Sequence, residues 1–156
     1  MNHQEPRKLQ LLQTGSSHFG VFVDEIATIE PWREPTPLPH APRSVLGVVS
    51  IQGRMLTVLD LARLQGGEAA SSDAVGAVPG HLIALRGDEQ LALAVDALGE
   101  TIQLAASDFA EFAAKETAGT LVLAVLKHEG ADVNILNLKE LFPTAIQGRQ
   151  RRRRRF

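Results

Sequence analysis

The chain has no cysteine, no tyrosine and a single tryptophan among its 156 residues. The absence of cysteine excludes disulfides, thiol catalysis and cysteine-ligated zinc, and it fits a reducing compartment. Aromatic residues make up only 4% of the chain, so a core must be packed mainly from Leu, Val, Ile and Ala. The hydrophobic share of 44% is sufficient for such a core in a chain of one domain's length.

Several kinds of segment and site have no support in the sequence. Residues 1–8 contain no apolar core and are not expected to form a signal peptide. The apolar run at 121–126 is far too short to cross a bilayer. The histidines lie at positions 3, 18, 40, 81 and 128 without the spacing of metal ligands, so neither a metal site nor a cofactor is expected. No glycine-rich nucleotide-binding loop occurs.

Basic residues are concentrated at the C-terminal end. Six of the sixteen Lys and Arg residues follow position 148, and the other ten stand against eighteen Asp and Glu, a formal charge of −8. An acidic body does not favour nucleic-acid binding. Residues 144–156 are expected to form a disordered basic tail that contacts anionic membrane surfaces weakly. The arginines expected to contact the membrane surface are Arg151, Arg152, Arg153, Arg154 and Arg155.

The most informative segment joins a proline-rich arm to a predicted β-hairpin. Alternating prolines keep residues 35–42 extended, because each ring fixes its own φ and restricts the residue before it. Strands are expected over 46–51 and 55–61, with a tight turn at Gln52-Gly53-Arg54. The arm could serve a polyproline-binding partner, but a rigid connection within the fold is favoured. The segment offers no nucleophile or phosphate cradle, which favours a surface that partners bind.

The same pattern occurs twice along the chain. Residues 46–61 match 123–138 when the glycines of the two turns are aligned, and both end in Leu-Asp/Asn-Leu. Upstream, residues 19–26 resemble 91–98 in the same order. Two matching elements at nearly the same offset indicate a duplicated unit.

The repeat also bears on a possible catalytic pair. Asp24 and Asp96 could be imagined as two carboxylates for acid/base work. However, both follow a valine at equivalent places in the two halves. One structural position used twice explains them better, and no enzyme activity is expected.

Short strands and turns account for the remaining chain. Further strands are expected over 9–12, 19–23, 82–85 and 91–95. The spacing of Ile26 and Ile29 predicts a short helix or helical turn within 24–32. Residues 66–80 are expected to form a flexible loop, and 106–118 are ambiguous, with Ser107 able to cap a short helix. This pattern predicts a mainly β chain built as small barrels.

The arm and the first hairpin also carry a family resemblance. Pro-Leu-Pro-x-Ala-Pro at 37–42, Val-x-Gly-Val-x-x-x-x-Gly-Arg at 45–54 and Val-x-Asp-Leu at 58–61 resemble the CheW-like domain of bacterial chemosensory systems. The resemblance covers 7–143 and implies one domain of two interleaved lobes, each a small five-stranded β-barrel, lying side by side with short helices.

The function that this resemblance implies is that of a non-catalytic adaptor. Such proteins couple the cytoplasmic tips of methyl-accepting chemoreceptors to the regulatory domain of a CheA-type histidine kinase. A cytoplasmic location at membrane-associated receptor arrays is implied. Two alternatives stay open: an adaptor of a pilus-motility or other chemosensory pathway, and a nucleic-acid-binding small-barrel protein that uses its arginine tail.

The resemblance also indicates which residues contact the receptor. These residues are Ile26, Thr28, Gly47, Val48, Gln52 and Gly53. Family members usually carry Arg where Gln52 stands and Glu where Thr28 stands, so both charges are missing here. Their joint loss favours a divergent adaptor. Contact with the kinase is expected at the ends of each barrel.

Overall fold

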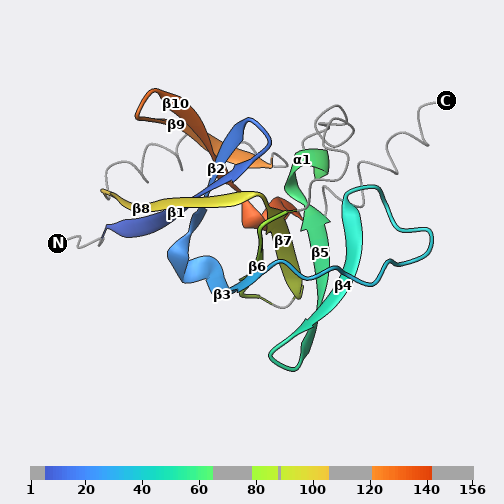
Figure 1. Cartoon of the computed structure of the whole chain (residues 1–156). Coiled ribbons are helices and arrows are strands. Elements are labelled where there is room, and N and C mark those ends of the chain that lie inside the picture. Colours follow the sequence, from blue (N-terminus) through green and yellow to red (C-terminus); the bar gives the residue numbers. More distant parts are fainter. Residues whose placement is uncertain (1–5, 65–78, 88, 106–120, 142–156) are drawn as a thin grey trace.

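The computed structural model describes residues 6–64, 79–87, 89–105 and 121–141, and their main architecture is β (Figure 1). The strands are β1 (Arg7–Thr14), β2 (Ser17–Phe22), β3 (Ile26–Pro31), β4 (Val45–Ile51), β5 (Arg54–Asp60), β6 (His81–Leu85), β7 (Leu91–Val95), β8 (Ala97–Leu104), β9 (Val122–His128) and β10 (Ala131–Leu136). The short helices are η1 (Val23–Glu25), α1 (Leu61–Leu64) and η2 (Leu138–Glu140). The expected loop at 66–80, the ambiguous stretch at 106–118 and the expected tail at 144–156 fall largely or wholly outside the described residues.

The strands form two five-stranded sheets that exchange strands between the two halves of the chain. Sheet A has the order β8-β1-β2-β10-β9, and sheet B has the order β3-β6-β7-β5-β4. Each strand number in one sheet differs by five from the number at the same place in the other sheet. The topology therefore shows the duplicated unit. Each half gives two strands to one sheet and three to the other. The mainly β fold with two subdomains is confirmed, but the sheets are open and are not closed barrels.

Sheet B shows why its central strands have continuous apolar sequences. Leu82 and Ala84 of β6 pack into one buried cluster, while Ile83 packs into another on the opposite face. On β7, Ala92 and Leu93 divide in the same way. A strand covered on both faces needs apolar residues at every position, so its sequence loses the alternation of a half-exposed strand.

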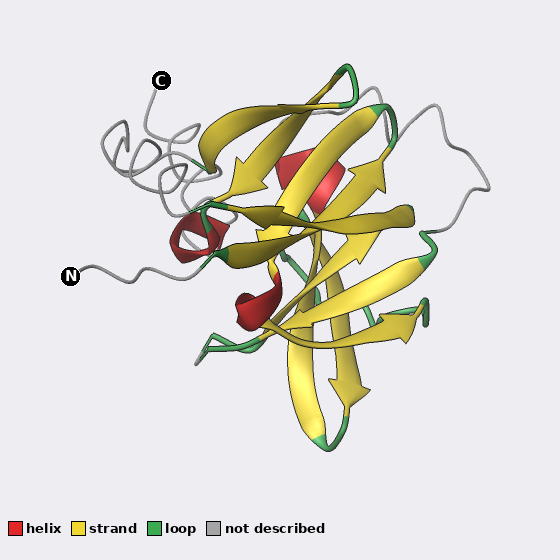
Figure 2. Cartoon of the chain, turned by 90° about the vertical axis from the view of Figure 1, so that its left-hand side faces the viewer, coloured by secondary structure: helices red, strands yellow, loops and turns green. Residues whose placement is uncertain are grey.

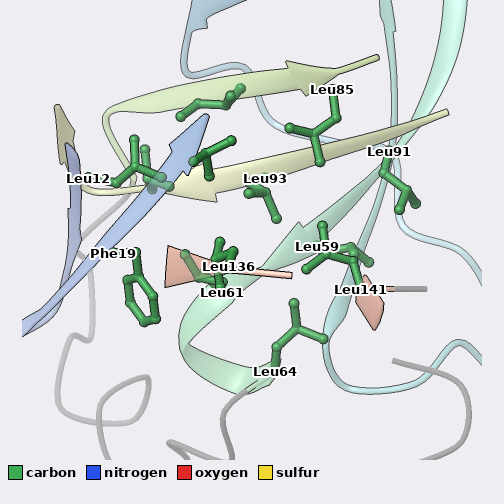
Figure 3. Close-up of a cluster of buried hydrophobic side chains, with 13 residues drawn as sticks. Leu12, Phe19, Leu59, Leu61, Leu64, Leu85, Leu91, Leu93, Leu136 and Leu141 are labelled. Carbon is green, nitrogen blue, oxygen red and sulfur yellow. The ribbon is translucent and has the colours of Figure 1, made fainter. Parts of the chain in front are cut away.

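Three buried clusters follow from this arrangement. The largest lies between the two sheets (Figure 3) and contains Leu12, Phe19, Val21, Leu59, Leu61, Leu64, Ile83, Leu85, Leu91, Leu93, Val95, Leu136 and Leu141. A second covers the other face of sheet B, and a third covers the other face of sheet A. The two halves of the chain therefore share one continuous structure and fold around a common interface.

The short helix or helical turn predicted within 24–32 is confirmed only at its N-terminal end. Only Val23–Glu25 forms a helical turn, and Ile26–Pro31 forms the edge strand β3. A bulge places the three residue steps from Ile26 to Ile29 of β3 opposite only two residue steps of β6, from Leu85 to Ile83. Because of this bulge, both isoleucines lie on the same face of a strand, which produces the three-residue spacing that resembled a helix.

The strand β8 was not predicted. Among the described strands it pairs only with β1, at the edge of sheet A, and its middle residues, Gly99 to Thr101, are exposed. An exposed edge strand lacks a regular apolar pattern, so its sequence gives little signal. In the part of the chain that the structure describes, no helix has the length and hydropathy needed to span a membrane.

Candidate interaction surface

The proline arm covers the outer edge of β4. Thr36 and Val48 exchange two backbone hydrogen bonds, with N–O distances of 2.8 and 2.9 Å. Pro35 is buried beside this contact, whereas Pro37 and Leu38 are exposed. An uncovered strand edge is open to pairing with other chains. The arm therefore protects part of this edge and leaves its proline tip accessible.

Gly47 allows the arm to approach β4. Its φ is +147°, and a Cβ built at this position would lie 2.6 Å from the carbonyl carbon of Thr36. A side chain would have to displace the backbone of the arm, so the close contact requires glycine. Gly47 is itself buried. Its role in this surface is to hold the arm in place.

The hairpin of β4 and β5 ends in a two-residue turn. Gln52 and Gly53 have φ values of +52° and +80°, the combination that a tight hairpin turn of the primed type requires. Both residues are exposed, and nothing lies within 4 Å of a Cβ built on Gly53. Figures 1 and 2 show this hairpin extending beyond the rest of the molecule.

The second copy of the hairpin has the same turn. Glu129 and Gly130 between β9 and β10 have φ values of +52° and +83°. This hairpin lies at the opposite end of the molecule from the β4–β5 hairpin in both views (Figures 1 and 2). The duplication therefore gives two tips of equal backbone geometry but different side chains, Gln52 on one and Glu129 on the other.

The outer face of the β4–β5 hairpin carries apolar groups. Val48 pairs with Thr57 and Ser50 pairs with Met55, and these four side chains lie on the face of the hairpin opposite Val49, Leu56 and Val58, which belong to the second cluster. Met55 has 58% of its surface exposed, more than any other large apolar side chain that the structure describes. Met55 was not among the residues predicted from the sequence to lie on a contact surface. The available signal was the alternation of a strand, which places Met55 on the face opposite its buried neighbour Leu56.

The six residues chosen from the sequence do not form a single patch. Gly47, Val48, Gln52 and Gly53 lie together on the β4–β5 hairpin. Ile26 and Thr28 belong to β3, and β6, β7 and β5 separate that strand from β4 in the sheet. Ile26 packs against the cluster between the sheets. Thr28 pairs with Ala84, on the face that holds the second cluster.

Charged groups surround the turn that precedes β3. The Arg7 guanidinium forms two hydrogen bonds with the Asp24 carboxylate, at 2.7 and 3.1 Å, and lies 3.9 Å above the Phe22 ring. Burial raises the pKa of the neighbouring Glu25 above its ordinary value. Arg7 and Lys139 oppose this rise, and the Asp24 carboxylate adds to it.

Asp24 and Asp96 do not form a carboxylate pair for catalysis. Asp24 binds Arg7, whereas Asp96 accepts a 2.7 Å hydrogen bond from the backbone N–H of Gly15. Asp24 lies where the chain passes from β2 in sheet A to β3 in sheet B, and Asp96 lies where it passes from β7 in sheet B to β8 in sheet A. Each carboxylate thus stabilises one of these two connections. The repeat explains their equivalent positions, as the sequence predicted, although their partners differ.

Comparison with known proteins identifies the family. The model of the CheW-like domain matches residues 8–145. The chemotaxis protein CheW of Rhizobium meliloti strain 1021 is 26% identical over 140 residues, covering 88% of both chains. A probable chemotaxis protein CheW of Rhizobium etli is 32% identical over 72 residues, 46% of each chain.

A solved structure supports the same fold. The crystal structure of the scaffolding protein TtCheW from Thermoanaerobacter tengcongensis matches with a TM-score of 0.65 and 16% identity, covering 85% of this chain and 89% of that one. This similarity and the family match over residues 8–145 agree with the arrangement of two five-stranded sheets. The chain therefore belongs to the CheW-like domain family.

Proposed function

We propose that this protein couples methyl-accepting chemoreceptors to a CheA-type histidine kinase, and that receptor contact involves the β4–β5 hairpin. Its family makes it a non-catalytic adaptor of chemotaxis signalling. The family match over residues 8–145 carries this conclusion, because it includes all of the strands except the first residue of β1. Residues 7–143 would then act as one adaptor unit.

The receptor surface that we propose divides its six residues between contact and support. Val48 and Gln52 are accessible on the hairpin, and the exposed Met55 extends the same surface. Gly47 and Gly53 allow the backbone conformation of the hairpin that carries these side chains. Ile26 and Thr28 lie on the edge strand β3, and Ile26 would support that strand by packing against the cluster between the sheets. The kinase regulatory domain would bind the ends of the two sheets.

The two equal turns provide a matched test of the hairpin. We expect Gln52→Ala to weaken binding to a receptor cytoplasmic-tip fragment, measured by isothermal titration calorimetry. Glu129→Ala places the same change at the same φ on the other hairpin and should leave receptor binding unchanged. Equal effects of both substitutions, or no effect of either, would reject the β4–β5 hairpin as the receptor contact.

The cellular pathway forms a separate part of the proposal. Thr28 and Gln52 replace the charged residues that are usual in the family, which supports a divergent partner in a pilus-motility or other alternative array. A cytoplasmic location at membrane-associated arrays follows from the proposed partners. Comparing the affinities for receptor tips of flagellar and alternative systems from one genome would distinguish the pathways.

The arginine tail would add a weak membrane contact. Arg151, Arg152, Arg153, Arg154 and Arg155 lie outside the described residues, and their charge alone motivates the idea. Deletion of residues 149–156 should reduce flotation with anionic liposomes, and unchanged flotation would exclude this contact. A nucleic-acid function is disfavoured by the acidic body, and tight binding to single strands with a steep salt dependence would support it instead.

A further inference from the structure

A histidine and two glutamates meet at the end of sheet A that carries the β9–β10 hairpin. His128 is the last residue of β9, Glu129 begins the turn, and Glu100 lies on β8. The Nε2 atom of His128 is 2.7 Å from a carboxylate oxygen of Glu100 and 3.7 Å from one of Glu129. One ligand atom from each residue fits within 4.8 Å of the other two.

The backbone positions all three groups. Glu129 has a φ of +52°, which the two-residue turn requires. On β8, the Gly99 carbonyl accepts a 2.8 Å hydrogen bond from the Gln10 side-chain amide, and the Thr101 hydroxyl lies 3.1 Å from the Gln10 side-chain oxygen. The residues on both sides of Glu100 are therefore anchored to β1, which holds Glu100 opposite the turn.

The cluster has an excess of negative charge. Two carboxylates share one imidazole, so they repel each other unless a positive charge lies between them. Lys127 is adjacent in sequence, but its ammonium group lies 3.1 Å from Asp132 and forms an ion pair there. A cation bound between the imidazole and the two carboxylates would supply this charge.

We propose that Glu100, His128 and Glu129 bind a divalent transition-metal ion such as Zn²⁺. One imidazole nitrogen and two carboxylate oxygens suit such ions, with water completing the coordination. Metal–ligand bonds of about 2.1 Å place tetrahedral ligands about 3.4 Å apart. The ligand atoms here are separated by 2.7 Å and more, up to 4.8 Å, so small side-chain movements would admit the ion.

The bound ion would act as a clamp on sheet A. β8 and β9 are the first and last strands of that sheet, and neither pairs with the other through its backbone. The Glu100–His128 contact already joins them through side chains. Spacing along the sequence could not reveal this set, because Glu100 lies 28 residues before His128 and the fold alone brings them together.

The test is calorimetric titration of Zn²⁺ into the tag-free full-length protein. We expect one binding site, weakened about tenfold or more in both His128→Gln and Glu100→Gln. His18→Gln is the matched control, since His18 lies on β2 outside the cluster, and its affinity should equal that of the unmodified protein. Circular dichroism without metal would verify that each variant is folded.

A second measurement does not depend on the variants. Zn²⁺ should shift the imidazole NMR signals of His128 in the unmodified protein at one equivalent, before those of the other histidines. The proposal is overturned if no site of unit stoichiometry appears, if either cluster variant binds Zn²⁺ as tightly as the unmodified protein, or if His128 does not respond first. Those results would leave the 2.7 Å contact between Glu100 and His128 as the role of the cluster.

Discussion

Gly47 lies directly against the backbone of Thr36, at the point where the proline arm joins the edge of β4. A Cβ on Gly47 would lie 2.6 Å from the Thr36 carbonyl carbon. We predict that Gly47→Ala destabilises the fold by about 3 kcal/mol, because it combines overlap with a φ that L-residues rarely adopt. Urea denaturation followed by circular dichroism would measure this loss.

Gly53→Ala is the control for this substitution. Gly53 also has a positive φ, but a Cβ there meets nothing within 4 Å. Only backbone strain applies, and we expect a loss of about 1–2 kcal/mol. If the two alanine variants proved equally stable, the contact between the arm and β4 would not be the reason for glycine at position 47.

The two hairpin turns can be stabilised by residues better suited to their backbone. Gln52 and Glu129 both have φ values of +52°, a conformation in which asparagine is favoured. We expect Gln52→Asn and Glu129→Asn each to raise the free energy of unfolding by about 0.5 kcal/mol. Urea denaturation of both variants would measure this. A loss of stability in both would contradict the assigned turn geometry.

Asp96 ties the crossing from β7 to β8 to the turn between β1 and β2. Its carboxylate accepts the 2.7 Å hydrogen bond of the Gly15 N–H. Because Asp96 is exposed, we expect Asp96→Ala to cost about 1 kcal/mol. Asp96→Asn keeps an oxygen acceptor and should lose less. Thermal melts of the two variants would test this, and an alanine variant as stable as the asparagine variant would contradict it.

Glu25 makes stability depend on pH. Its pKa is raised from 4.5 by burial and by Asp24, although Arg7 and Lys139 lower it. The folded state therefore holds the proton more tightly than the unfolded chain. Stability falls as the pH rises from 4.5 through the raised pKa, and this penalty persists above it.

Glu25→Gln removes this titration. The stability of the variant relative to the unmodified protein should be greater at about pH 7.5 than at about pH 4. The reason is that position 25 gains a charge between these two pH values only in the unmodified protein. Urea denaturation at both pH values measures the difference. A relative stability that is constant, or that decreases toward neutral pH, would show that the site does not penalise the charged form of Glu25.

Local patterns in the sequence predicted the hairpins and the central strands. The Gln52-Gly53 turn was visible because glycine marks positive φ between apolar runs, and the 82–85 and 91–95 strands were visible because they are apolar throughout. The family resemblance gave the two-lobed architecture. The sequence therefore predicted those features that depend on neighbouring residues or on a known family.

Features that depend on distant segments were missed. The bulge in β3 arises from pairing with β6, and it made Ile26 and Ile29 resemble a helix. The open edges of the sheets could not be inferred from residue patterns. The same holds for the candidate surface, since the exposure of Met55 and the contact between Glu100 and His128 depend on how the fold places these residues.

Coupling itself is the most direct test of the proposed function. Receptor-containing vesicles, the cognate CheA-type kinase and this protein would be mixed and sedimented, and the kinase in the pellet would be quantified. We predict that the kinase co-sediments with the receptor only when this protein is present. An equal amount of kinase in the pellet with and without the protein would contradict its role as the adaptor between them.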